Sequence, residues 1–182
     1  EASESHNATV IFLHGLGGSG PSAYRLMTEY VDMPSLRHVK WIFPTSPELF
    51  ITIAGKSGPA WYDIKGMSVT EYILNKVEDT SQIKSSAKAI HDLVDAEIDG
   101  GISSDRIVIA GASQGGAMAL YSALTYSQSL AGVLAINSYL PNARNFLWCG
   151  SVLQPSETPV LMCHGQEDNV VSHVFGKLSY YY

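Results

Sequence analysis

A glycine-flanked serine lies a little past the middle of the chain. Residues 111–115 are Gly-Ala-Ser-Gln-Gly and match the pattern G-x-S-x-G, with Ser113 at the centre. An apolar run precedes the motif and an alanine-rich stretch follows it, which predicts the strand–turn–helix context of a nucleophile elbow. The start of the helix favours negative charge at the reacting centre. Ser113 is therefore a candidate nucleophile, and the alternative is a glycine-rich turn with an ordinary capping serine.

A second glycine-rich segment, His14–Gly20, follows the first apolar run and permits two interpretations. Glycines at positions 15, 17 and 20 match the dinucleotide-binding pattern G-x-G-x-x-G. That fingerprint also needs an acid about 20 residues further on, whereas the corresponding run ends Ile42-Phe43-Pro44. We favour the alternative, an oxyanion loop in which the N–H groups of Leu16 and Gln114 flank the developing negative charge. A dinucleotide-dependent oxidoreductase is the less favoured enzyme class.

A candidate acid follows the last apolar run. On this architecture the chain order is serine, acid, histidine, and the acid belongs at the carboxyl end of a late strand. Asp168 has that position, with Glu167 as the competing acid next to it. The alternative for Asp168 is an exposed loop residue.

The elements that must position these residues alternate along the chain. Short apolar runs bounded by Gly or Pro are typical of buried parallel strands, and the stretches between them have helical spacing. Thr80 or Ser81 is expected to cap the longest helix, with Gly100-Gly101 as its stop. This alternation predicts an α/β fold, a mostly parallel sheet with helices on both faces. The expected strands are 9–13, 39–43, 106–110, 132–137 and 160–163, and the expected helices are 22–33, 81–98 and 113–126.

Composition and charge narrow the possible classes of protein further. The 182 residues are 46% hydrophobic and 15% charged, enough for one domain with a sizeable core. A net charge of −6 without a basic cluster gives no reason to expect nucleic-acid binding or a polybasic membrane contact. Cys149 and Cys163 are too few for a disulfide scaffold. No run approaches the roughly 20 apolar residues of a membrane span, and the first residues do not resemble a signal peptide, so we expect a cytoplasmic protein.

Taken together, these residues resemble the acyl-protein thioesterase and lysophospholipase-like carboxylesterases of the α/β-hydrolase fold. The resemblance extends from about Thr9 to Lys177. Several separate blocks in the right order carry it: 12–17 (Phe-Leu-His-Gly-Leu-Gly), 61–64 (Trp-Tyr-Asp-Ile), 111–116 (Gly-Ala-Ser-Gln-Gly-Gly), 130–133 (Leu-Ala-Gly-Val), 139–141 (Tyr-Leu-Pro) and 163–165 (Cys-His-Gly) with Asp168.

The resemblance implies a function and roles for particular residues. Family members cleave fatty-acyl thioesters on protein cysteines, lysophospholipids and small carboxyl esters, without metal or cofactor. Ser113 would be the nucleophile, Asp168 the triad acid, and Leu16 and Gln114 the oxyanion donors. An acylated protein or lipid would be the substrate, with transient membrane contact. Trp61 would line an acyl pocket near an apolar lid over 49–54, within the long 45–80 connection, and the lid residues are Leu49, Phe50 and Ile51.

The catalytic histidine is the departure from the family pattern. In the family it follows the acid by a further helix and strand, whereas this sequence ends at Tyr182. None of the histidines at 6, 14, 38, 91, 164 and 173 has a suitable position. We therefore expect the histidine after Tyr182, and a single domain over 1–182 that lacks its C-terminal strand and helix. Without such a histidine, the protein would be a catalytically impaired hydrolase fold that binds acyl chains.

Overall fold

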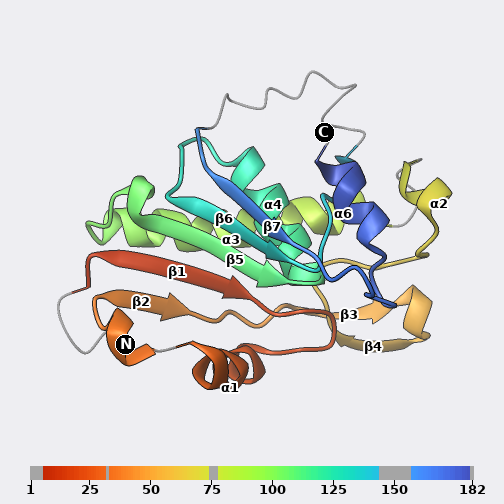
Figure 1. The fold of residues 1–182 in the computed structure, drawn as a ribbon, viewed down its shortest axis with the longest axis horizontal. Helices are drawn as coiled ribbons and strands as arrows, with labels where there is room; N and C mark the ends of the chain where they lie inside the picture. Colours follow the sequence, from red (N-terminus) through yellow and green to blue (C-terminus); the bar gives the residue numbers. More distant parts are fainter. Residues whose placement is uncertain (1–5, 32, 74–77, 144–156, 181–182) are drawn as a thin grey trace.

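Five short apolar segments form the central sheet of the computed structural model, which describes residues 6–31, 33–73, 78–143 and 157–180. The sheet has the order β2-β1-β5-β6-β7, and every neighbouring pair is parallel (Figure 1). All five predicted strands and the α/β class are confirmed. The strands are β1 (Ala8–Leu13), β2 (Val39–Ile42), β5 (Ile107–Ala112), β6 (Gly132–Ile136) and β7 (Val160–Cys163).

Side chains of successive strand residues enter two separate cores, because a strand alternates its faces. In β1, Ile11 and Leu13 belong to the larger core with α3 (Thr80–Asp99) and α4 (Gln114–Thr125). Phe12 packs on the other face with Ala23 of α1 (Gly20–Tyr30). The sheet is thus covered by helices on both faces, as the sequence predicts (Figure 1).

The start of α3 differs by one residue from the prediction. The N-cap is Asp79, not Thr80 or Ser81, and its carboxylate accepts the N–H groups of Ser81 and Gln82. Aspartate is among the best N-cap residues, so one position earlier in the chain satisfies two otherwise free amides. At the other end Gly101 has φ +97° and provides the left-handed stop.

The long connection after β2 forms a small ribbon of its own. β3 (Glu48–Ile51) and β4 (Lys56–Pro59) pair antiparallel through η2 (Thr52–Ala54), beyond the end of the main sheet (Figure 1). The apolar run expected as a lid therefore lies in an antiparallel ribbon. Three short helices complete the connections before and after it, namely η1 (Met33–Leu36), α2 (Val69–Ile73) and η3 (Ser104–Arg106).

β7 is less buried than the sequence predicts. Val160 and Leu161 are 48% and 59% exposed, because β7 pairs with β6 alone within the described part of the sheet. Cys163, the last residue of β7, is an exposed free thiol, while Cys149 lies outside the described residues. A loop leads from β7 to α6 (His173–Ser179). The carboxyl ends of parallel strands meet at one edge, where ligand sites of open α/β sheets form.

Candidate active site

The turn between β5 and α4 holds Ser113 in an unusual backbone conformation. Its φ is +54° and its ψ is −125°, outside the regions that side chains normally permit. Two contacts maintain this turn: the Ser113 N–H donates to the Ile136 carbonyl at 2.9 Å, and the Ser138 hydroxyl donates to the Ser113 carbonyl at 2.7 Å. Strain of this kind concentrates at functional sites. The predicted strand–turn–helix context is confirmed.

Glycine is required in this motif by close backbone approach. A Cβ on Gly115 would lie 2.1 Å from the Leu13 carbonyl oxygen of β1. A Cβ on Gly111 would lie 2.4 Å from the Gly115 carbonyl carbon. The missing side chains therefore let the first turn of α4 lie directly on the ends of β1 and β5, which brings Ser113 beside the loop that follows β1.

The loop after β1 lies against the serine. A Cβ on Gly15 would meet the Ser113 Cβ at 3.3 Å, so the loop and the serine are in contact. Gln114 is the first residue of α4, where an N–H has no carbonyl partner within the helix. In the part of the chain that the structure describes, the Leu16 N–H donates to no carbonyl or side chain. Ser113, Leu16 and Gln114 line one cavity together, so these predicted site residues are neighbours.

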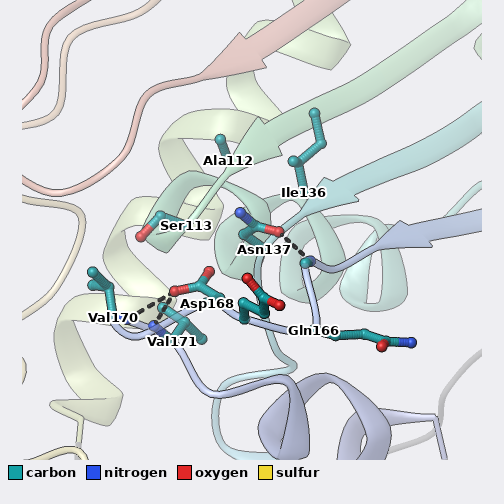
Figure 2. A pocket seen from close by; sticks show the side chains of 10 residues that line it. Ala112, Ser113, Ile136, Asn137, Gln166, Asp168, Val170 and Val171 are labelled. Carbon is teal, nitrogen blue, oxygen red and sulfur yellow. Dashed lines mark hydrogen bonds between the residues drawn. The ribbon is translucent and has the colours of Figure 1, made fainter.

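Asp168 lies on the loop after β7 and lines a second cavity, of about 760 Å³, together with Ser113 (Figure 2). Its Oδ1 accepts the N–H groups of Val171 and Val170 at 2.9 and 2.8 Å. These hydrogen bonds to the charged form hold the pKa of the Asp168 carboxyl below its usual range. The carboxylate is therefore ionised at neutral pH, and the structure brings it to the same edge of the sheet as Ser113.

Three histidines, at positions 14, 91 and 164, form hydrogen bonds with groups other than Ser113. The His14 ring bonds the Ser46 N–H and the Gly15 carbonyl, as shown by contacts at 3.0 and 2.7 Å. His91 bonds the Ser122 carbonyl on α4. His164 bonds the Val171 carbonyl at 2.7 Å, and its Nε2 lies 3.8 Å from the Asp168 carboxylate. None of the six histidines, all within the described ranges, forms a hydrogen bond with Ser113.

The cavity shared by Ser113 and the two candidate oxyanion donors has a volume of about 580 Å³ and largely apolar walls. Sequence reasoning did not identify these walls, which come from the 45–80 connection, the segment after β6 and the loop after β7. Ile53 was within the predicted apolar run, but nothing in the spacing of the others distinguished them from core residues. The apolar wall residues are Ile53, Ile64, Met67, Tyr139, Val170 and Val171.

The residues expected around an acyl pocket have other positions. Phe50 of β3 is 59% exposed, while Ile51 and Trp61 are 3% and 4% exposed. None of these, nor Leu49, lines either cavity beside Ser113. Trp61 instead packs on the loop after β1, with its ring centroid 5.1 Å from that of His14.

The described residues, 6–31, 33–73, 78–143 and 157–180, contain neither a cluster of metal ligands nor a membrane-spanning helix. Within those ranges, no group of three or more His, Cys, Asp or Glu side chains is arranged to hold a metal ion. Across the same ranges, helices long and apolar enough to cross a membrane are absent.

Comparison with known proteins gives consistent matches. The model of the phospholipase/carboxylesterase family matches residues 1–182. An acyl-protein thioesterase 1 of Neurospora crassa is 42% identical over 178 residues, which are 96% of this chain and 72% of that protein. The acyl-protein thioesterase 1 of Schizosaccharomyces pombe is 41% identical over 97% of this chain and 75% of its own.

Solved structures share the fold. The crystal structure of Arabidopsis thaliana SOBER1 superposes with a TM-score of 0.78 at 28% identity, covering 94% of this chain and 80% of that one. The crystal structure of Zea mays acyl-protein thioesterase 2 also superposes with a TM-score of 0.78, at 27% identity, covering 98% of this chain and 79% of that one.

Proposed function

Because this chain belongs to the phospholipase/carboxylesterase family of α/β-hydrolases, we propose that it cleaves acyl thioesters or esters through an acyl-enzyme on Ser113. One observation carries this proposal. A strained serine faces an apolar cavity that it shares with Leu16 and Gln114, whose N–H groups are the proposed oxyanion donors. Such an arrangement suits acyl transfer, in which negative charge develops on one carbonyl oxygen beside the attacking hydroxyl.

The proposed reaction has two halves. The Ser113 Oγ bonds to the acyl carbon and gives its proton to a general base, while the Leu16 and Gln114 N–H groups hold the oxyanion. Collapse of this intermediate breaks the bond to the leaving thiolate or alkoxide, which takes up that proton. Water then attacks the acyl-enzyme by the same route and releases a carboxylic acid.

The proposed general base is a histidine outside these 182 residues. No histidine in the described ranges forms a hydrogen bond with Ser113, and the chain spans 72–77% of the length of the fungal relatives that it matches. Asp168 is the proposed group that orients this histidine, because it lines the cavity next to Ser113 and its pKa is low. A negative carboxylate there would stabilise the imidazolium that forms during attack.

The cavity favours an apolar acyl group. Ile53, Ile64 and Met67 offer walls without charge, and each buried CH₂ of a chain contributes about 0.8 kcal/mol to binding. The proposed substrates are fatty-acylated cysteines of proteins, lysophospholipids or small carboxyl esters. The relatives named acyl-protein thioesterase 1 support the first of these classes. A cytoplasmic location is part of the same proposal.

A fluorophosphonate probe tests the nucleophile, because serine attack on phosphorus displaces fluoride and leaves a stable adduct. The full-length protein should gain one adduct by intact mass, and peptide mapping should place it on Ser113. Ser113→Ala should gain none and should lose thioester hydrolysis by about 10⁴-fold or more. The exposed Ser103 provides a matched control, since Ser103→Ala should label like the wild type. Acyl-chain binding without adduct or turnover would instead indicate a catalytically impaired acyl-binding protein.

A further inference from the structure

The side chain of Gln114 points into the protein, although the residue opens a helix beside the nucleophile. Only 2% of Gln114 is exposed. Its Oε1 accepts the backbone N–H of Trp61 at 2.9 Å, and its Nε2 donates to the carbonyl of Tyr62 at 2.7 Å. Both ends of the amide are thus bound to one short segment, at residues 53 and 52 positions earlier in the sequence. This segment comprises residues 59–62 and is named the 59–62 segment.

The same segment also holds the loop after β1. The Trp61 indole Nε1 donates to the His14 carbonyl at 2.8 Å. The Gly17 N–H donates to the Pro59 carbonyl, also at 2.8 Å. These two attachments lie on either side of Leu16, so the backbone that carries the Leu16 N–H is fixed before and after that residue.

The 59–62 segment is in turn anchored to the core. The Ser86 hydroxyl of α3 donates to the Trp61 carbonyl at 2.5 Å. Trp61 is 4% exposed and Tyr62 is fully buried. The segment therefore has little freedom of its own, and a buried polar network whose members are all hydrogen-bonded is rigid.

We propose that Gln114 and Trp61 are positioning residues that set the separation of the two oxyanion donors. One donor is carried by the loop that Trp61 holds, and the other is the N–H of Gln114 itself. Backbone donors cannot adjust by changing rotamer, so their spacing depends on what connects the two pieces of backbone. The inference rests on the proposed function, because it assigns a role within the proposed oxyanion site.

The expected loss of catalytic rate follows from geometry. A displacement of about 1 Å in a catalytic arrangement can cost 10²-fold in rate. Loss of the connection leaves both amides present but less well placed, so we expect less than the 10²–10³-fold that removal of a whole donor costs. The loss should fall on the transition state, in which the oxyanion exists, and should spare binding of the uncharged substrate.

Two variants break the connection at different points. Gln114→Met keeps the length of the side chain but accepts and donates no hydrogen bond, and Trp61→Phe keeps a ring but lacks the indole N–H. In the full-length protein, each should lower kcat for a fatty-acyl thioester about 10- to 100-fold, with KM within twofold. Affinity for a trifluoromethyl ketone, which Ser113 attacks to form an oxyanion, should fall by the same factor. The matching methyl ketone should bind as before.

A third variant separates positioning from general destabilisation. Leu120 is buried on α4 and contributes to the large core. Leu120→Ala should therefore lower Tm as much as Gln114→Met and Trp61→Phe do, while kcat stays within twofold of the wild type. Variants of Gln114 and Trp61 that keep wild-type kcat and ketone affinity would overturn the inference. So would losses that follow Tm as Leu120→Ala does, or that affect both ketones equally. A wild-type protein without turnover or ketone adduct would overturn the proposed function as well.

Discussion

The two sides of Ser113 are held in place in different ways. On the side of the proposed donors Leu16 and Gln114, here named the oxyanion side, hydrogen bonds join residues 47 to 53 positions apart. They run from Trp61 to His14 and to Gln114. On the acid side, the carboxylate of Asp168 is held by the N–H groups of Val170 and Val171, two and three residues further along. The first side is a product of the tertiary fold, and the second is mainly a local turn.

Exposure does not separate the two sides as clearly. Gln114 and His14 are 2% and 3% exposed although Leu16 is 37% exposed, and Val170 is 78% exposed although Val171 is 5% exposed. The different kinds of attachment suit the chemistry proposed for each side. Oxyanion donors are backbone amides that must be fixed in advance, while a carboxylate is a side chain that contributes its charge. Perturbing the acid side should therefore act on catalysis through lost charge, and perturbing the oxyanion side should act through the placement of the backbone that carries the donors.

Asp168→Asn should give the largest effect on rate. The asparagine Oδ1 can still accept the two backbone N–H groups, so the turn should form while the negative charge is lost. We expect kcat to fall about 10⁴-fold, as when a triad aspartate is replaced by its amide, with Tm nearly unchanged. Steady-state hydrolysis and thermal unfolding of the full-length protein measure the two quantities.

Glu167 supplies the control for that experiment. It is exposed and lines the same cavity, and Glu167→Gln removes an equal charge one residue away. Turnover by Glu167→Gln should stay within about twofold of the wild type. A large loss in this variant together with an active Asp168→Asn would show that the neighbouring acid has the catalytic role.

On the oxyanion side, Gly115→Ala should act through stability. The added Cβ would lie 2.1 Å from the Leu13 carbonyl oxygen, which is backbone and cannot move away alone. We expect the free energy of unfolding to fall by about 3 kcal/mol, the upper range for overpacking. Gly132→Ala is the matched change, because its nearest contact of 3.5 Å is ordinary. Urea unfolding that places both variants within about 0.5 kcal/mol of each other would contradict the prediction.

The difference between local and tertiary contacts also explains which features could be predicted from the sequence. Local patterns identified the five strands and the turn at Ser113, because an apolar run or a glycine motif depends only on neighbours in the chain. The α3 cap was misplaced by one residue because Asp79, Thr80 and Ser81 are all capping types, and only the structure shows which carboxylate or hydroxyl reaches the free amides.

Tertiary contacts were beyond sequence reasoning. The expected place of Trp61 was a pocket wall, but its indole N–H and backbone are bound to the loop after β1 and to α4. Such a position depends on how the 45–80 connection folds over the sheet, and no periodicity within that connection encodes it. The cavity walls at Ile64 and Tyr139 could not be predicted for the same reason, since these residues meet only in the folded chain.

The smallest predicted effect is a pH dependence of stability that distinguishes the two sides. The His14 Nε2 accepts the Ser46 N–H, so its Nδ1 carries the hydrogen and donates to the Gly15 carbonyl. Burial lowers the pKa of His14 from 6.5, with the Gly15 bond opposing that shift. The unfolded chain therefore binds the proton more readily, and this contribution to stability is present above pH 6.5 and lost as pH falls through the folded pKa.

The contribution of Asp168 to the free energy of unfolding is also lost as pH falls. This loss occurs over a lower pH range, because the folded pKa of Asp168 lies below 3.8. Unfolding measured downward from pH 7.5 should therefore reveal the oxyanion side first. His14→Asn, which keeps an N–H donor but does not titrate, should lose less stability than the wild type just below pH 6.5. The buried Glu78, whose pKa burial raises to about 7, gives the opposite slope in both proteins and cancels in the difference. Parallel profiles for His14→Asn and the wild type would show that the loop after β1 does not sense pH through His14.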